Sequence, residues 1–372
     1  MKRMLIAASF LALLIAAACS KGTAGQAQEK APDGLKICIV TGSGVDDGSF
    51  GEDCYNGILA FTKNNPEATV ATVKEPDISK EMQAVEDVIA DYDVLVLPGF
   101  QFAPVGQLAI DNPDKKVILV DSAPTDASGA EVELPNVYSM VFHEEESGFF
   151  AGVAAALETK TGKVAVVNGL AFPSNVNYQY GFMSGVNYSN KYFGSGARIV
   201  ELPSYAGTDL TGKNVGGNYI GGFTDEAGGK VVGQNLINQG VDVLFVAAGA
   251  SGLGVFTAAK EASNVYLIGV DTDQYKDGFK GQENIMLTSA VKVMHSNVTR
   301  QLQAVKDGTF QGKNDVLGSS TDSTGYISAE GRHRLQADTL ARMQETYDLV
   351  KGGKIVPAAN FNGHTPLDFP GL

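Results

Sequence analysis

Short apolar runs of strand length alternate with longer helical patterns through most of this chain, and this alternation constrains the fold more than any other feature. Several runs, such as Val94–Leu97 and Val117–Val120, are apolar at consecutive positions, as expected of parallel strands covered on both faces. The repeated βαβ order indicates an α/β protein with doubly wound parallel sheets. The predicted strands are residues 36–41, 68–73, 93–97, 116–121, 136–141, 163–168, 198–202, 242–247, 266–270 and 285–290.

Ten strands are more than one compact sheet usually holds, so we expect two lobes. The break falls near Phe142, where a predicted strand runs into the acidic start of a helix. Residues 307–325 are rich in Gly, Ser and Asp and are predicted to form a loop. The predicted helices are residues 50–63, 79–91, 144–159, 176–189, 226–239 and 252–262.

The first residues have the pattern of a secretory signal. Lys2 and Arg3 precede an apolar run, Met4–Ala18, that ends in three alanines before Cys19. A helix of that length rises about 22 Å at 1.5 Å per residue, which is short of a hydrocarbon core of about 30 Å. We expect residues 1–18 to be a lipoprotein signal peptide, Cys19 to carry lipid and residues 19–35 to be a flexible tether. The alternative is an ordinary signal peptide with an incidental cysteine.

Charge and cysteine content exclude some classes of protein. The leader carries two of the 28 basic residues and none of the 42 acidic ones, so the mature chain has a net charge of −16. This balance argues against a nucleic-acid partner, because binding to phosphates relies on clustered Lys and Arg. Apart from Cys19 only Cys38 and Cys54 remain. Two separately buried thiols are favoured, and a disulfide is the alternative.

Glycine-rich loops follow five of the predicted strands, where ligands bind in open α/β sheets. Ser49 and Glu52 have the spacing of a capping box, which would start a helix at Phe50. Phe50 and Phe223 stand in similar loops and would sandwich a flat ligand from opposite lobes, although a phenylalanine there also packs under its own loop. The five loops are residues 42–50, 98–102, 221–225, 248–254 and 269–274.

The sequence contains no complete set of residues with the spacing of a catalytic motif. Residues 207–214 nearly match a P-loop, but Asn214 replaces the Ser or Thr that would hold magnesium. The acidic run 144–146 suits a helix N-terminus better than a metal. The sequence therefore predicts no catalytic group, no metal and no cofactor. The histidines at 143, 295, 333 and 364 are scattered along the chain.

Several loops together resemble the basic membrane protein (Bmp/PnrA-like) lipoproteins, the substrate-binding components of ABC transporters. Among them are Asp46–Phe50 (DDGSF), Gly221–Asp225 (GGFTD) and Ile268–Gln274 (IGVDTDQ), which occur in the family's order. Lys351–Pro357 also resembles the family's C-terminal signature. Further matching pieces are residues 145–156, 240–249 and 288–292.

The resemblance implies a type I periplasmic-binding-protein fold with a purine nucleoside enclosed between two hinged lobes. Lobe 1 would comprise residues 36–142 plus about 288–318, and lobe 2 residues 143–287 plus about 319–366. Carried over by position, the two phenylalanines would stack on the base. Asp271 and Lys292 would serve the ribose and the polar rim of the site, where a carboxylate accepts hydrogen bonds from neighbouring hydroxyls. The remaining expected ligand-binding residues are Asp46, Asp47, Asp121 and Gly249.

The chain departs from the family at two positions that would bind the base edge. Gly42 and Gly51 stand where the family usually has Asp and Asn. Recognition of a purine in particular is thereby left open. The candidates for replacing those groups are Asp46, Asp47, Gln101 and Asn175.

The predicted function is that of a lipid-anchored, monomeric receptor that captures a nucleoside-like solute by hinge closure and delivers it to an ABC permease. The bacterial cell membrane and an outer-membrane leaflet both remain open as its location. The alternatives are the same fold binding a sugar or other small polar metabolite, a surface adhesin or host-interaction lipoprotein with a vestigial pocket, and an extracytoplasmic enzyme.

Overall fold

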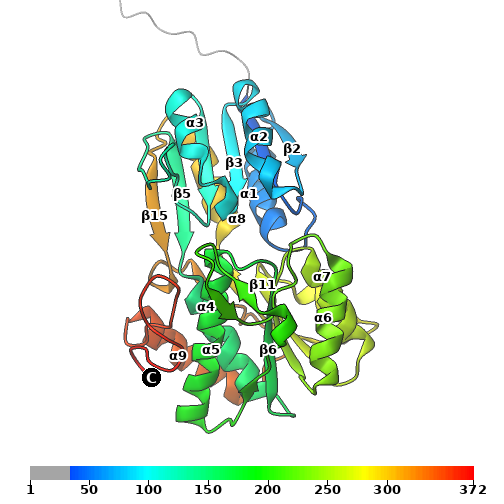
Figure 1. Ribbon diagram of the computed structural model, residues 1–372. Coiled ribbons are helices and arrows are strands. Elements are labelled where there is room, and N and C mark those ends of the chain that lie inside the picture. The colour runs from blue at the N-terminus through cyan, green and yellow to red at the C-terminus, as the bar shows by residue number, and fades with distance from the viewer. Residues whose placement is uncertain (1–33) are drawn as a thin grey trace, which may run out of the picture. The chain divides into compact units, whose positions relative to one another are not determined.

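The computed structural model describes residues 34–372 (Figure 1). The predicted signal peptide, Cys19 and nearly all of the predicted tether lie outside the described residues. Two six-stranded sheets, each covered by helices on both faces, form two lobes. The parallel, doubly wound architecture predicted from the sequence is confirmed. No helix among residues 34–372 combines the length and apolar character needed to span a membrane.

The sheet of the first lobe is parallel throughout, in the order β15-β5-β4-β3-β1-β2. Helices α1 and α8 cover one face and α2 and α3 the other. The strands are β1 (Lys36–Thr41), β2 (Thr69–Lys74), β3 (Val94–Pro98), β4 (Lys116–Val120), β5 (Val137–Phe142) and β15 (Lys313–Leu317), and the helices are α1 (Phe50–Asn64), α2 (Ile78–Val88), α3 (Val105–Asp111) and α8 (Met294–Lys306).

The sheet of the second lobe has the order β16-β14-β11-β10-β6-β7, with β16 antiparallel. Helices α4, α5 and α9 cover one face and α6 and α7 the other. The strands are β6 (Lys163–Asn168), β7 (Arg198–Ile199), β10 (Val243–Ala247), β11 (Tyr266–Asp271), β14 (Met286–Lys292) and β16 (Thr324–Tyr326), and the helices are α4 (Glu144–Glu158), α5 (Pro173–Phe193), α6 (Glu226–Asn238), α7 (Ser251–Glu261) and α9 (Ala337–Lys351).

Some details differ from the sequence predictions. Residues 307–325, predicted as a loop, contain β15 and the start of β16, which are edge strands without a continuous apolar run. Residues 288–292 pair within the second sheet, so the crossing follows Lys292 instead of lying near residue 288. Cys38 and Cys54 are separate buried thiols in the cores on opposite faces of the first sheet. The P-loop-like segment 207–214 forms a small hairpin, β8 (Gly207–Thr208) and β9 (Asn214–Gly216), rather than the start of a helix.

The chain passes between the lobes three times, and hydrogen bonds join these crossings. The amide of His143 donates to the carbonyl of Leu317 at 2.9 Å, and the amide of Val293 donates to the carbonyl of Ser323 at 2.9 Å. Glu146 accepts hydrogen bonds from the third crossing, including one from the Ser319 amide at 2.6 Å. The acidic run 144–146 therefore connects crossing segments in addition to starting a helix.

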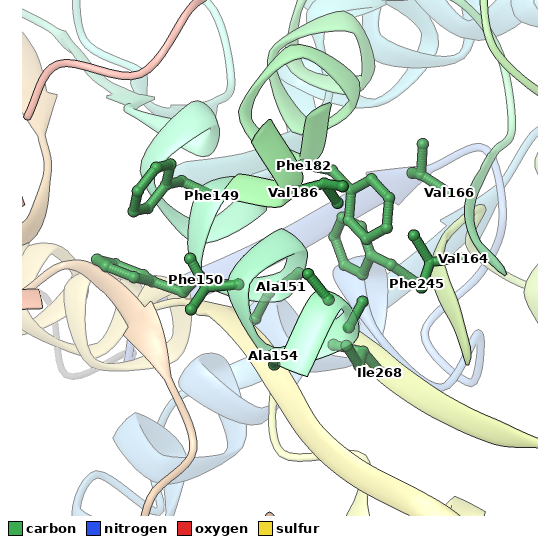
Figure 2. Packing of buried hydrophobic residues seen from close by; sticks show 14 of the residues in the cluster. Phe149, Phe150, Ala151, Ala154, Val164, Val166, Phe182, Val186, Phe245 and Ile268 are labelled. Carbon is green, nitrogen blue, oxygen red and sulfur yellow. The ribbon is translucent and has the colours of Figure 1, made fainter. Parts of the chain in front are cut away.

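Helices α4 and α5 approach so closely that only glycine fits at their crossing. Cβ atoms at Gly152 and Gly185 would overlap the carbonyl oxygens of Phe182 and Phe149, respectively. This approach buries aromatic side chains against the sheet (Figure 2): Phe182 of α5 stacks on Phe245 of β10 with ring centroids 5.9 Å apart. The helix pair that begins at the crossing from the first lobe is thus tightly packed.

Gly152→Ala is expected to lower the free energy of unfolding by about 1–3 kcal/mol, the usual cost of overpacking a core. Chemical denaturation measures the change. Gly222→Ala is the matched control, because a Cβ there meets no atom within 4 Å. Equal unfolding midpoints for the two variants would contradict the packing described here.

Candidate ligand-binding site

A cavity of about 480 Å³ lies between the lobes at the carboxyl ends of both sheets. Its volume is in the range of small-molecule sites. The first lobe contributes residues that follow β1, β3 and β4 together with the start of α2, and the second lobe contributes the start of α5 and the loops after β6, β9, β10 and β11. The predicted site residues Phe50, Asp121, Phe223, Gly249 and Asp271 all line it.

Phenylalanine side chains reach the cavity from both lobes. Phe50 is the first residue of α1, and Phe223 stands in the loop before α6. The ring of Phe223 packs over Gly169, where a Cβ would overlap it, and lies 5.8 Å from the ring of Phe172. Phe172 in turn lies 6.0 Å from Phe100 of the first lobe. Neither Phe100 nor Phe172 was predicted as a site residue, although Phe100 belongs to one of the five loops.

Asp47, not a capping box, holds the start of α1. Its carboxylate accepts hydrogen bonds from the amides of Ser49, Gly51 and Glu52 at 2.9–3.1 Å. The Ser49 side chain makes no capping bond. Asp47 is therefore buried in its own loop, whereas Asp46 is exposed. Neither residue lines the cavity, so the structure does not bring these two predicted residues to the ligand site.

A buried ion pair lies at the base of the cavity and joins the lobes. Lys292, the last residue of β14, has a side chain only 1% exposed, and its Nζ donates to both carboxylate oxygens of Asp121 at 2.6 and 2.8 Å. Asp271 and Glu144 bring carboxyl oxygens to 3.7 and 3.9 Å from the same nitrogen. Lys292 does not itself line the cavity; its Nζ lies 4.7 Å from the centre of the Phe50 ring. Lys292 therefore contacts Phe50 and Asp121, which do line the cavity.

The charges of this cluster shift its pKa values. Burial raises the pKa of Glu144 to about 8 and that of Asp271 to about 6, although Lys292 opposes both shifts. Burial alone would lower the pKa of Lys292, but the surrounding carboxylates, Asp121 foremost, hold it above its usual value. The Tyr178 hydroxyl donates to Asp271 at 3.0 Å. The cluster therefore keeps its lysine charged and offers carboxylate acceptors to the cavity.

Asp121 and Asp271 occupy equivalent places in the two lobes. Each directly follows or ends the strand at the corresponding position of its sheet, β4 or β11, and each has a left-handed backbone, with φ of 65° and 66°. Such strain in non-glycine residues costs of order 1–3 kcal/mol and concentrates at functional sites. The pair of strained acids makes this end of the cavity a candidate for binding the polar part of a ligand.

The other expected groups contribute differently. Gly249 has a φ of 54° and lies under Phe223, where backbone must approach the ring closely. Gln101 and Asn175 both line the cavity. The Asn175 amide already donates to Asn168 and to the Ala247 carbonyl. Within residues 34–372, no three His, Cys, Asp or Glu side chains are placed to hold a metal ion.

Comparison with known proteins agrees with this geometry. The family model of PnrA-like ABC transporter substrate-binding proteins (Bmp) matches residues 35–196 and 213–334. The chain belongs to this family. It is therefore an ABC transporter substrate-binding protein, and the resemblance seen in its loops is confirmed.

Relatives and solved structures support the family and the fold. The ABC transporter nucleoside-binding protein BmpA of Lactococcus lactis is 29% identical over 379 residues, covering 96% of this chain and 100% of that protein. The CD4+ T-cell-stimulating antigen of Listeria monocytogenes is 26% identical, with 93% and 96% covered. A solute-binding protein of an ABC transporter system from Aeropyrum pernix superposes with a TM-score of 0.74 at 21% identity, covering 88% of this chain and 94% of its own. The type I fold is thereby confirmed.

Lys292→Met is expected to lower the free energy of unfolding by about 3–5 kcal/mol, because it leaves Asp121 buried without its partner. The double variant Lys292→Met/Asp121→Asn should recover a large part of that loss, since the acid closest to Lys292 is then uncharged and only the more distant Asp271 and Glu144 lose their counter-charge. Urea denaturation of four proteins, the parent, Lys292→Met, Asp121→Asn and the double variant, gives the coupling between the two sites. Additive losses in the double variant would contradict the role assigned to the ion pair.

Proposed function

We propose that this substrate-binding protein captures a nucleoside, with its base between Phe50 and Phe223 and its sugar hydroxyls at the Asp121–Asp271 end of the cavity. The observation that carries the proposal is the arrangement within one cavity: aromatic rings from both lobes and, beside them, two buried acids held by Lys292. Rings suit the flat base. Carboxylates suit neighbouring hydroxyls, which donate to them.

The mechanism is closure of the lobes over the ligand, with no covalent chemistry. A ligand that touches both walls favours the closed arrangement by its differential affinity for it. The three crossings would serve as the hinge, and the Lys292–Asp121 pair would fix how the lobes meet near it. The closed complex would then be delivered to an ABC permease.

Anchoring is the remaining part of the proposal. The pattern that ends at Cys19 supports export and lipid attachment, which would keep a monomeric receptor beside its permease at the membrane. Mass spectrometry of the mature N-terminal peptide tests this directly. An unmodified Cys19, or a chain that retains residues 1–18, would contradict the anchor.

A sugar or another small polyol is the second candidate ligand. The acids at Asp121 and Asp271 favour it, because they would bind hydroxyls of any such molecule, and aromatic rings also stack on sugars. Thermal unfolding in the presence of nucleosides or of free sugars separates the two. A rise in melting temperature with nucleosides alone supports the proposal, and a rise with sugars alone replaces it.

Phe50→Ala and Phe223→Ala are each expected to weaken nucleoside binding by about tenfold or more. Stacking of a base on an aromatic ring is worth about 1–3 kcal/mol, and about 1.4 kcal/mol is a factor of ten in affinity. Titration calorimetry measures the change. Phe279→Ala, which removes a 46% exposed ring away from the cavity, is the matched control. Nucleoside affinities equal to that of the control would exclude the stacking arrangement.

A further inference from the structure

Glu81 is a buried carboxylic acid in the wall of the cavity, with no part in the proposed stacking of the base or binding of the sugar. It lies in the first turn of α2, is 1% exposed and lines the cavity. Its Oε2 atom has no hydrogen-bond partner among the described residues. Nor does any Lys, Arg or His among residues 34–372 form a salt bridge with it. An acid buried without a cation is costly unless donors reach it.

The position of Glu81 depends on the glycine that follows β1. A Cβ atom at Gly42 would overlap Oε1 of Glu81. The carboxyl group of the helix thus occupies the space that a side chain at the end of the strand would take. Because residue 42 is glycine, the Glu81 side chain of α2 has room to lie in the cavity wall beside the end of β1.

The Oε2 atom of Glu81 lacks a hydrogen-bond donor among the described residues, so a bound ligand would have to supply one. Burial raises its pKa to about 7, a hydrogen bond with Gln101 opposes that shift, and the charge of Glu75 adds to it. Gln101 also lines the cavity, beside Gly99. N–H groups of a bound ligand would stabilise the ionised form and satisfy the acid.

The place of Glu81 beside Gly42 separates it from Asp121 and Asp271, the acids that we propose bind the ligand's hydroxyls. Gly42 follows β1 and Asp121 follows β4, and β3 lies between these two strands. Neighbouring strands are about 4.8 Å apart, so the two acidic ends of the cavity are roughly 10 Å apart across the sheet edge. A ligand that uses both ends carries hydroxyls on one side and N–H donors on the other.

We propose that the Glu81 carboxylate accepts hydrogen bonds from the edge of the base and thereby makes this receptor selective for guanosine among the purine nucleosides. The inference rests on the proposed nucleoside function. An ionised carboxylate only accepts hydrogen bonds. Guanine presents two adjacent donors, N1–H and the 2-amino group, to such a pair of oxygens. Hypoxanthine presents N1–H alone, and adenine presents an acceptor at N1, which repels a carboxylate.

Titration calorimetry of guanosine, inosine and adenosine against the parent protein and Glu81→Gln tests the inference. The parent should bind guanosine most tightly, inosine next and adenosine most weakly. Glu81→Gln keeps the shape of the side chain but replaces one acceptor by a donor, so guanosine should weaken at least tenfold while adenosine changes less than threefold. Glu86→Gln, an exposed site on the same helix, is the control, and thermal unfolding verifies that each variant is folded.

The outcomes separate this inference from the function on which it rests. Equal affinity of the parent for guanosine and adenosine, or an equal loss of both in Glu81→Gln, overturns the role of Glu81 but leaves a nucleoside receptor. Absence of binding by all three nucleosides overturns both. Loss confined to guanosine and inosine supports the assignment.

Discussion

The ion pair between Lys292 and Asp121 is the interaction on which the site depends. It joins the last residue of a second-lobe strand to the residue after a first-lobe strand, and the two side chains are only 1% and 5% exposed. A single lysine among three acids is electrostatically stable only when its partners stay close. The pair therefore links the lobes beside the cavity, with the lysine nitrogen 4.7 Å from the centre of the Phe50 ring and 3.7 Å from Asp271.

The rest of the site follows from how parallel sheets end. Both sheets direct the carboxyl ends of their strands to the same cavity, so the groups that line it lie at strand ends, in the loops that follow them or near the starts of helices. Asp121 and Asp271 lie at the ends of β4 and β11, while Glu81 of α2 lies beside Gly42, which follows β1. The aromatic side chains of Phe50, Phe100, Phe172 and Phe223 also line the cavity. On this division rests our proposal that one end of the cavity binds a sugar and the other the edge of a base.

Sequence patterns predicted the parts that depend on continuous burial. Strands covered on both faces read as unbroken apolar runs, so the central strands were predicted. Phe50, Phe223 and Asp271 stand where such strands and their loops meet, and the structure places them in the cavity wall, while their binding of a ligand stays a prediction. The edge strand β15 was missed because its exposed face carries polar residues. Asp47 was misplaced because a loop aspartate that caps a helix has the same local sequence as one that binds a ligand.

Glu81 shows most clearly what local sequence does not contain. It is a glutamate in an ordinary first turn of a helix, and only the packing of α2 against Gly42 brings it into the cavity. The buried state of Lys292 was likewise invisible, because its three acidic neighbours come from distant parts of the chain. The sequence already showed glycine at residue 42, where the family usually has Asp. Only the structure shows that the Glu81 side chain of α2 occupies the space left there.

Native mass spectrometry of the intact protein, equilibrated with an equimolar mixture of nucleosides and simple sugars, tests the central claim most directly. The account predicts one retained molecule per chain with the mass of a purine nucleoside. Retention of a sugar alone, or of none of the components, would contradict it.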